Sequence, residues 1–417
     1  MAASIVDKPH APFPSPSSAA VDPSAQKSSS ITTTASQDNN TASSNSFVRT
    51  SHLGQWAQLI RSPDQRPLLV HLNADTSWLV SLPWVRADAP SSPGPPAGRT
   101  RFNVLIDPWF QGPQSDVAAF FSTQWHVVQP SVATIAELND VLRSVESYPG
   151  CNDGVAAASN VSEPGKDDDK GTRSSLGSVS DFHIDAVIIS HEFTDHCHRA
   201  TLEELPRHIP IFAADIAAGL IRSWSYFETV ITIPNLETGI HWSKLTVLGG
   251  LPSFLRIGRA TTAGNALYYH SAILVAFDIS RYQGDAAGRT EEDPAGEVII
   301  YSPHGIESQD LAGVQSCGLK TLALLHGLHD VRIWMMKQLN LGALNGIKAV
   351  SVSGAKYWIA THDEVKKGSG IIGGLLRRTQ YTLQEAVASQ QKQLEESGQA
   401  PEYQFIELGS GDGILLE

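Results

Sequence analysis

Short apolar runs recur along most of the chain and are bounded by polar residues, glycine or proline. Runs of about four to eight residues rich in Val, Ile and aromatic residues are typical of β-strands. They predict strands at 67–72, 77–82, 102–107, 185–190, 210–214, 244–250, 266–277, 297–302, 321–327, 355–362 and 403–408. Apolar residues three or four positions apart indicate helices instead. They predict helices at 116–124, 132–145, 199–206, 213–224, 331–340 and 377–398.

The early predicted strands lie close together, whereas strands and helices alternate from residue 185 onward. This order favours two sheets with helices on their outer faces, an α/β layered sandwich, over one doubly wound sheet. Residues 1–46 are mostly Ala, Ser, Thr, Pro and Asn, and we expect a disordered N-terminal arm there. Residues 47–417 are expected to form one domain, with surface insertions near 87–99, 146–179 and 283–296.

Composition narrows the class of protein. The 417 residues include 30 Lys and Arg against 43 Asp and Glu, a formal net charge of −13. A broad nucleic-acid-binding surface needs clustered basic residues, so no nucleic-acid partner is expected. Only three cysteines occur, which favours a reducing compartment. The sequence has no signal-peptide pattern and no apolar run near the roughly 18 residues of a membrane helix, so we expect a cytoplasmic protein without a membrane partner.

The stretch SHEFTDHCH, residues 190–198, follows the predicted strand at 185–190 directly. A short polar loop at a strand end can direct His191, Asp195 and His196 toward one point. Imidazole and carboxylate ligands together suit Zn²⁺, Mn²⁺ or Fe²⁺. The competing interpretation is structural, with Asp195 as the N-cap of the helix predicted from residue 199.

The loop resembles the HxHxDH motif of the metallo-β-lactamase superfamily, and three further stretches support the resemblance. VLIDPWFQGP (104–113) is similar to the early aspartate motif of the family branch with an IDPW signature, which includes sugar-phosphate lactonases and phospholipase-type hydrolases. HLNADTSWLVSLP (71–83) resembles the first hairpin of that branch. KYWIATHDE (356–364) looks like the family's last strand, which ends in a ligand histidine, here His362. The resemblance spans about residues 67–410 and implies a four-layer αββα sandwich.

Three departures from the family pattern stand out. Phe193 occupies the place of the second histidine of HxHxDH and has no lone pair to offer. The family's middle histidine is missing after the predicted strand at 244–250, and His270, inside a strand pattern, is the nearest candidate. A bridging aspartate is expected after the strand at 297–302, where the sequence YSPHG offers His304 instead.

The resemblance therefore implies one metal ion, Zn²⁺ or else Mn²⁺ or Fe²⁺, held by Asp195, His196 and His362. His191 is a further ligand candidate, His304 either completes the metal shell or acts as general base, and Asp107 is expected to orient a ligand histidine. The implied function is hydrolysis of a small ester, lactone or phosphoester by a metal-activated water. One alternative is a non-catalytic protein of this fold that binds a metabolite or a protein, and another is a nucleic-acid-processing hydrolase.

Other histidines and a glycine-rich stretch have structural interpretations. His198 is expected at the surface or behind the ligands, and Cys197 as a buried filler. His326 and His329 are expected in a pocket-lining loop, with Asp330 capping the helix predicted from residue 331. ELGSGDG (407–413) resembles a methyltransferase motif, but a tight turn in a terminal hairpin is the favoured interpretation because few residues follow.

Overall fold

The computed structural model divides the chain into two units, residues 1–30 and 31–417, and all described residues belong to the second. Of the predicted insertions it describes only residues 96, 98 and 99 of 87–99, residues 146–149 of 146–179 and residue 296 of 283–296. Of the predicted arm, 1–46, it describes residues 33–34. The other residues of these ranges lie outside the described residues. The described residues are 33–34, 47–61, 65–84, 96, 98–115, 122–149, 182–261, 268–278, 296–333, 337–369, 376–379, 388 and 403–417.

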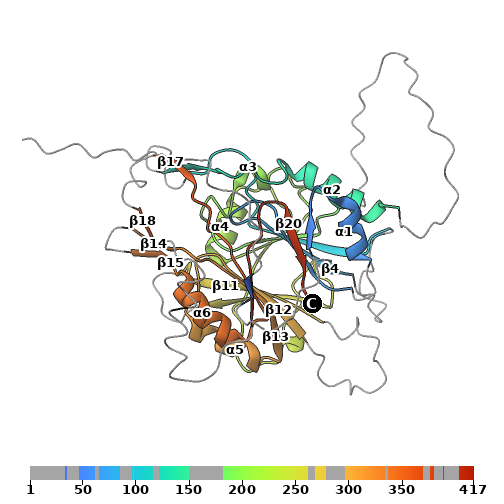
Figure 1. The fold of residues 1–417 in the computed structure, drawn as a ribbon. Helices are drawn as coiled ribbons and strands as arrows, with labels where there is room; N and C mark the ends of the chain where they lie inside the picture. Colours follow the sequence, from blue (N-terminus) through green and yellow to red (C-terminus); the bar gives the residue numbers. More distant parts are fainter. Residues whose placement is uncertain are drawn as a thin grey trace, which may run out of the picture. The chain divides into compact units, whose positions relative to one another are not determined.

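One sheet has eight strands, and helices cover its outer face. The strands, in spatial order, are β2 (Phe47–Arg49), β20 (Asp412–Leu415), β3 (Leu68–His71), β4 (Trp78–Pro83), β5 (Arg101–Ile106), β7 (Ala186–Ile189), β8 (Ile211–Ala213) and β9 (Val230–Thr232). From β5 to β9 neighbouring strands are parallel. The helices on this sheet are α1 (Leu53–Ile60), α2 (Ile135–Ser147), α3 (Arg199–Leu202) and α4 (Asp215–Ser223), seen above the sheets in Figure 1.

The second sheet has seven strands and carries two helices on its outer face. Its strands, in spatial order, are β1 (Thr33–Thr34), β19 (Gln404–Ile406), β16 (Tyr357–Ile359), β13 (Leu319–His326), β12 (Gly296–Ser302), β11 (Ser271–Asp278) and β10 (Leu255–Thr261). The helices are α5 (Ala312–Ser316) and α6 (Ala343–Ser353), below the sheets in Figure 1. β1 lies within the arm expected to be disordered and is an edge strand of this sheet, paired with β19.

Alternating side chains of each strand serve two different cores. In β4 and β5, Val80 and Val104 face the other sheet, whereas Leu79 and Leu105 face the helices. The seven-stranded sheet repeats this division, so both sheets are buried on both faces. Such strands are apolar at nearly every position, which is why they are visible in the sequence as continuous runs. The predicted αββα four-layer sandwich is confirmed.

Short elements complete the described part of the chain. β14 (Asp330–Ile333) pairs with β15 (Lys337–Asn340) and β18 (Leu376–Thr379), and β6 (Thr123–Trp125) pairs with β17 (Lys367–Ser369). Two 3₁₀ turns are η4 (Trp242–Lys244) and η5 (Ser308–Leu311). None of the helices in the described ranges has the length and apolar character needed to cross a bilayer.

Several predicted elements are wrong. The helix expected at 331–340 is replaced by the hairpin of β14 and β15, because strand pairing with β18 outweighs local helix preference. The residue at the start of the helix expected at 377–398 is likewise in β18, and most of that range lies outside the described residues. Of the helix expected at 116–124, the described residues 123–124 belong to strand β6.

Two further corrections concern strands near chain reversals. No strand covers 244–250, where Val247 is 37% exposed and Gly250 has φ +87°; the strand of this region is β10, further along. The terminal hairpin also does not form, because β19 belongs to one sheet and β20 to the other. Residues 407–411 instead cross between the two sheets, with Gly411 at φ +87°.

Candidate metal centre

The candidate metal centre lies where parallel strands of both sheets end. Asp107 follows β5 and His191 closely follows β7 in the eight-stranded sheet. His304 and His362 follow β12 and β16, which both run parallel to β13 in the other sheet. The carboxyl ends of parallel strands lie at the same edge of a sheet, so side chains from distant parts of the sequence converge here.

Four histidine rings pack together at this edge. The ring centroid of His196 lies 3.9 Å from that of His191, 5.1 Å from that of His304 and 4.9 Å from that of His362. Among the described residues, two groups of three offer potential ligand atoms. Within each group these atoms all lie within 4.8 Å of one another. The first group is His191, His196 and His304, and the second is Asp195, His196 and His362. The structure therefore brings together the four residues predicted to hold the metal and also His304, which was predicted to complete the metal shell or act as general base.

Three of the four imidazoles are held at Nδ1 by an oxygen acceptor. A ligand histidine usually donates one ring N–H to such an acceptor, which leaves the lone pair of the other nitrogen for the metal. The pairs are His196 Nδ1 with Asp107 Oδ2 at 2.7 Å, His304 Nδ1 with Asn340 Oδ1 at 2.7 Å, and His362 Nδ1 with Asp75 Oδ1 at 2.9 Å.

The opposite ring nitrogens fit a divalent cation. Nε2 of His196, Nε2 of His304 and both ring nitrogens of His191 are buried and have no hydrogen-bond partner within the described part of the chain. An unpaired buried polar atom costs about 1–3 kcal/mol, so several of them side by side need an explanation. Neutral imidazole nitrogens beside the Asp195 carboxylate are the donor set that Zn²⁺, Mn²⁺ or Fe²⁺ accepts.

The donor set favours one ion rather than two. His196 belongs to both groups of potential ligands, and the single lone pair of an imidazole nitrogen binds one ion at a time. Nδ1 of the same ring is occupied by Asp107, so the imidazole cannot bridge two ions. Phe193, where the sequence resemblance led us to expect a ligand histidine, is half-buried with its ring centroid 5.1 Å from that of His191, and it closes this side with an apolar surface.

Asp107 is fully buried and holds one face of the centre together. Besides His196 it accepts hydrogen bonds from the backbone N–H of Ser190 at 2.8 Å and its hydroxyl at 2.5 Å, and from the Tyr301 hydroxyl at 2.9 Å. Three described non-glycine residues have positive φ, and two of them, Asp107 (43°) and His362 (58°), are at this site. Strained backbone of this kind concentrates at functional sites. Asp107 lies where a residue orienting a ligand histidine was expected.

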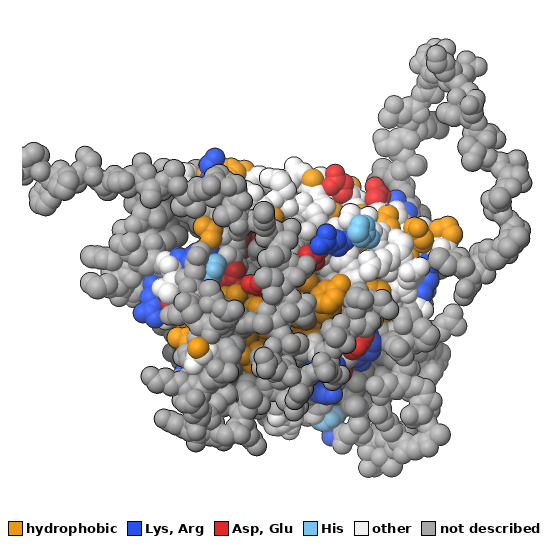
Figure 2. All heavy atoms as spheres, in the orientation of Figure 1, with side chains coloured by type: hydrophobic (Ala, Val, Ile, Leu, Met, Phe, Trp, Pro, Cys, Tyr) orange, Lys and Arg blue, Asp and Glu red, His pale blue; other side chains and the backbone are white. Residues whose placement is uncertain are grey.

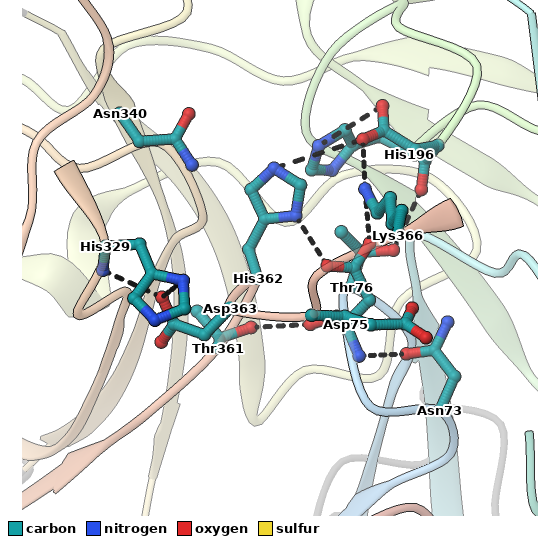
Figure 3. Close-up of polar contacts among 12 residues, drawn as sticks. Asn73, Asp75, Thr76, His196, His329, Asn340, Thr361, His362, Asp363 and Lys366 are labelled. Atoms are coloured by element: carbon teal, nitrogen blue, oxygen red, sulfur yellow. Dashed lines mark hydrogen bonds and ion pairs between the residues drawn. The ribbon is translucent and has the colours of Figure 1, made fainter. Parts of the chain in front are cut away.

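Asp75 and Lys366 belong to the site but were not identified from the sequence. Asp75 lies in the β3–β4 turn and holds His362 twice, since its backbone oxygen also accepts the His362 N–H at 2.8 Å. Lys366 Nζ lies 2.6 Å from Asp75 Oδ2 and 2.7 Å from Asp195 Oδ2, and its side chain is 6% exposed (Figure 3). The only sequence signal was the polar NADTS turn within the hairpin motif.

Burial and neighbouring charges together set the protonation states of the cluster. It lowers the pKa of His191 and His304 well below the usual range, with help from neighbouring histidines, and it lowers the pKa of His362. Burial also acts to lower the pKa of His196, but the Asp195 and Asp107 carboxylates outweigh it and raise that pKa. For Asp195, burial acts to raise the pKa, but Lys366, His196 and His362 together outweigh burial and hold that pKa well below normal. The neutral imidazoles of His191, His304 and His362 and the ionised Asp195 carboxylate are in the state that metal binding needs, whereas His196 releases a proton when it binds a metal.

The other histidines have structural partners. His270 lies outside both ligand groups, with Nε2 3.0 Å from the Leu339 oxygen. His198, rather than Asp195, is the N-cap of α3, accepting the Thr201 N–H. His326 contacts the Gly327 oxygen and Asn345, and His329 lies beside Asp363. Cys197 is a buried filler, as expected, and burial raises its thiol pKa. Asp330 begins β14 and caps no helix.

Gly305, the residue after His304, lies in a turn that only glycine fits without strain. Its φ is +81°, and an added Cβ would lie 2.6 Å from Leu341 Cβ and 3.0 Å from the Leu341 backbone oxygen. We expect Gly305→Ala to destabilise the fold by at least about 2 kcal/mol, since left-handed φ alone costs a non-glycine residue about 1–2 kcal/mol. Gly112 has the same φ with nothing within 4 Å of its Cβ position, so Gly112→Ala is the control. Denaturant unfolding of both variants measures the difference, and equal losses would show that the close contact does not matter.

Comparisons with known proteins give structural similarity only. No protein-family model matches the sequence, and the comparison with curated proteins gives no match. A possible metal-dependent hydrolase from Veillonella parvula is 12% identical, covering 84% of this chain and 100% of its own, with a TM-score of 0.43. An isothiocyanate hydrolase from Delia radicum gut bacteria is 14% identical, covering 83% and 98%, with a TM-score of 0.41. The metallo-β-lactamase fold protein YhfI from Bacillus subtilis is 11% identical, covering 83% and 98%, with a TM-score of 0.37.

The layers and strand order of the chain itself define its fold. Two sheets are packed face to face, and helices lie on the outer face of each. This is the αββα sandwich of the metallo-β-lactamase type, with the candidate centre at the strand ends.

Proposed function

We propose that the protein is a metal-dependent hydrolase of the metallo-β-lactamase superfamily, from the branch with an IDPW signature, that acts on a small ester, lactone or phosphoester in the cytoplasm. The observation that carries this proposal is the set of three imidazoles held at Nδ1 beside the Asp195 carboxylate. Asp195, His196 and His362 hold one ion, with His191 and His304 as additional donors. When bound, such an ion lowers the pKa of a water molecule to about 7 and polarises the attacked group.

The chain's own residues position these ligands. Asp107 fixes the ring orientation of His196, and Asp75 fixes that of His362. Loss of such outer partners typically weakens metal binding about 10–100-fold, so they are part of the site. For His304, the lowered pKa disfavours the general-base role, because a base with a pKa far below 7 takes up a proton weakly. We therefore assign His304 to the ligand shell.

Aromatic side chains limit access of water from one side. The Phe193 ring centroid lies 6.0 Å from that of His304, and the Tyr269 ring lies 5.6 Å from it. Tyr269 is 2% exposed and donates its hydroxyl hydrogen to the Gln338 oxygen. An apolar wall strengthens the electrostatic interaction of bound charges with the donor atoms because it lowers the local dielectric constant.

A non-catalytic metabolite- or protein-binding role is the second candidate. The observation that favours it is the ammonium of Lys366, which already pairs with the ligand candidate Asp195. Nucleic-acid processing has less support. On the face drawn in Figure 2 the described Lys and Arg side chains form separate small groups, whereas a phosphate backbone needs a continuous basic surface.

Metal content and hydrolysis test the proposal together. After purification without chelator, the chain should contain about one Zn²⁺, Mn²⁺ or Fe²⁺ ion, and it should hydrolyse at least one of a test ester, lactone or phosphoester. Treatment with a chelator should remove both the ion and the hydrolysis, and added metal should restore them. A content below about 0.2 ion per chain would refute the hydrolase function. A full equivalent of metal without hydrolysis of any of the three substrates would favour the binding role.

A further inference from the structure

We propose that the ammonium group of Lys366 is a built-in cation that occupies a second cation position, between Asp75 and Asp195, and so limits the centre to one metal ion. The inference concerns the site described above and deepens the proposed function, but it predicts a difference between variants that is independent of activity. It starts from the two short contacts of Nζ, 2.6 Å to Asp75 Oδ2 and 2.7 Å to Asp195 Oδ2.

The other oxygen of each of these two carboxylates faces a histidine of the candidate centre. Asp75 Oδ1 accepts from His362 Nδ1 at 2.9 Å, and Asp195 Oδ1 lies 3.7 Å from His196 Nε2 (Figure 3). Both Oδ2 atoms therefore converge on one point, at which Lys366 places its charge. Two carboxylate oxygens with room for water are a typical Mg²⁺ or Mn²⁺ site, whereas the histidine cluster suits Zn²⁺.

Charge balance supports a capacity of one ion. The three carboxylates that contact the histidines, from Asp75, Asp107 and Asp195, are buried and carry three negative charges when ionised. Lys366 and one divalent cation together carry three positive charges, which leaves the cluster neutral. Adding a second divalent cation beside Lys366 would leave an excess of positive charge in a buried site, where unpaired charge is costly.

The segment that carries Lys366 is held in place. Glu364, two residues earlier and 4% exposed, accepts the backbone N–H groups of Val127 and Val128 at 2.6 and 2.8 Å, and its other oxygen lies 2.6 Å from His126 Nδ1. The ammonium group also lies 5.3 Å from the centre of the Trp109 ring, within range of a cation–π contact. The lysine is therefore fixed between the carboxylates rather than free to swing out.

Variants that separate charge from volume test this inference. Lys366→Ala removes the ammonium and opens space for an ion with its waters, whereas Lys366→Met removes the charge but fills the space. Lys367→Ala, at the exposed neighbouring residue, is the control. Each protein is given one equivalent of Zn²⁺, then exposed to Mn²⁺, freed of loose metal by gel filtration and analysed for both elements.

We expect Lys366→Ala to gain about one Mn²⁺ per chain over the wild type, and Lys366→Met and Lys367→Ala to gain none. The zinc content of the wild type tests the proposed function separately, so a chain without zinc would refute that function while the manganese difference still decides the role of Lys366. A folded Lys366→Ala protein with the manganese content of the wild type would overturn the inference.

Lys366→Ser provides a second small variant should the alanine variant fail to fold, since its hydroxyl can hydrogen-bond to water in the emptied space. Circular dichroism measures whether each variant folds. If either variant folds with Mn²⁺ but not without it, the inference is supported, because a divalent cation then replaces the ammonium. Failure of both variants to fold at any Mn²⁺ concentration would overturn it.

Discussion

Replacing His196 or His362 by alanine should abolish tight metal binding. Each substitution removes a nitrogen that lies among the ligand atoms and is directed by a buried carboxylate. Losing a hydrogen bond behind a ligand costs about 10–100-fold in affinity, so losing the ligand itself should cost more than about 100-fold. Metal content after gel filtration, together with competition against a chelating dye, gives the size of the loss.

His270→Ala is the matched control for this experiment. His270 is also a buried histidine, but it lies outside both groups of potential ligands and contacts the Leu339 oxygen. We expect this variant to keep its metal even where its stability falls. Equal metal loss in all three variants would mean that folding, not ligation, had been disturbed, and retention of metal in His196→Ala would exclude the site as drawn.

The sequence predicted the sheets well because their strands are buried on both faces. Runs such as VLID and AVIIS lack the alternation of apolar and polar residues that is typical of surface strands. They correspond to β5 and β7. Helix α6 (Ala343–Ser353) was missed because a glycine flanks it at each end and two serines lie in its last turn. Both residue types weaken the helical pattern in the sequence. The predicted helix at 331–340 failed for the opposite reason, because pairing with a distant strand decided its structure.

The site was predictable where ligands follow strands and not where partners come from turns. His191, Asp195 and His196 are close in sequence, and His362 was found because it ends a strand in a recognisable motif. Asp75 and Lys366 leave no such trace: one lies in a hairpin turn and the other in the segment before β17, almost 300 residues apart in the chain. Their contact exists only after both sheets have packed, and it changes the charge of the site.

Asp107→Ala should be among the most destabilising single substitutions in the protein. It leaves the Ser190 N–H and hydroxyl, the Tyr301 hydroxyl and His196 Nδ1 without their buried acceptor, at about 1–3 kcal/mol for each unsatisfied group. The left-handed backbone at φ 43° adds about 1–2 kcal/mol for alanine. We expect a loss of at least about 4 kcal/mol, measured by urea unfolding.

Asp107→Asn separates this structural role from metal binding. Asparagine tolerates positive φ and keeps an acceptor oxygen, so the fold should lose much less stability than in the alanine variant. It removes the negative charge behind His196, however, and metal affinity should fall about 10–100-fold. Asp140→Ala, on the exposed face of α2, controls for a general effect of lost acidic charge. An asparagine variant with unchanged metal affinity would show that Asp107 supports the fold alone and does not tune the ligand.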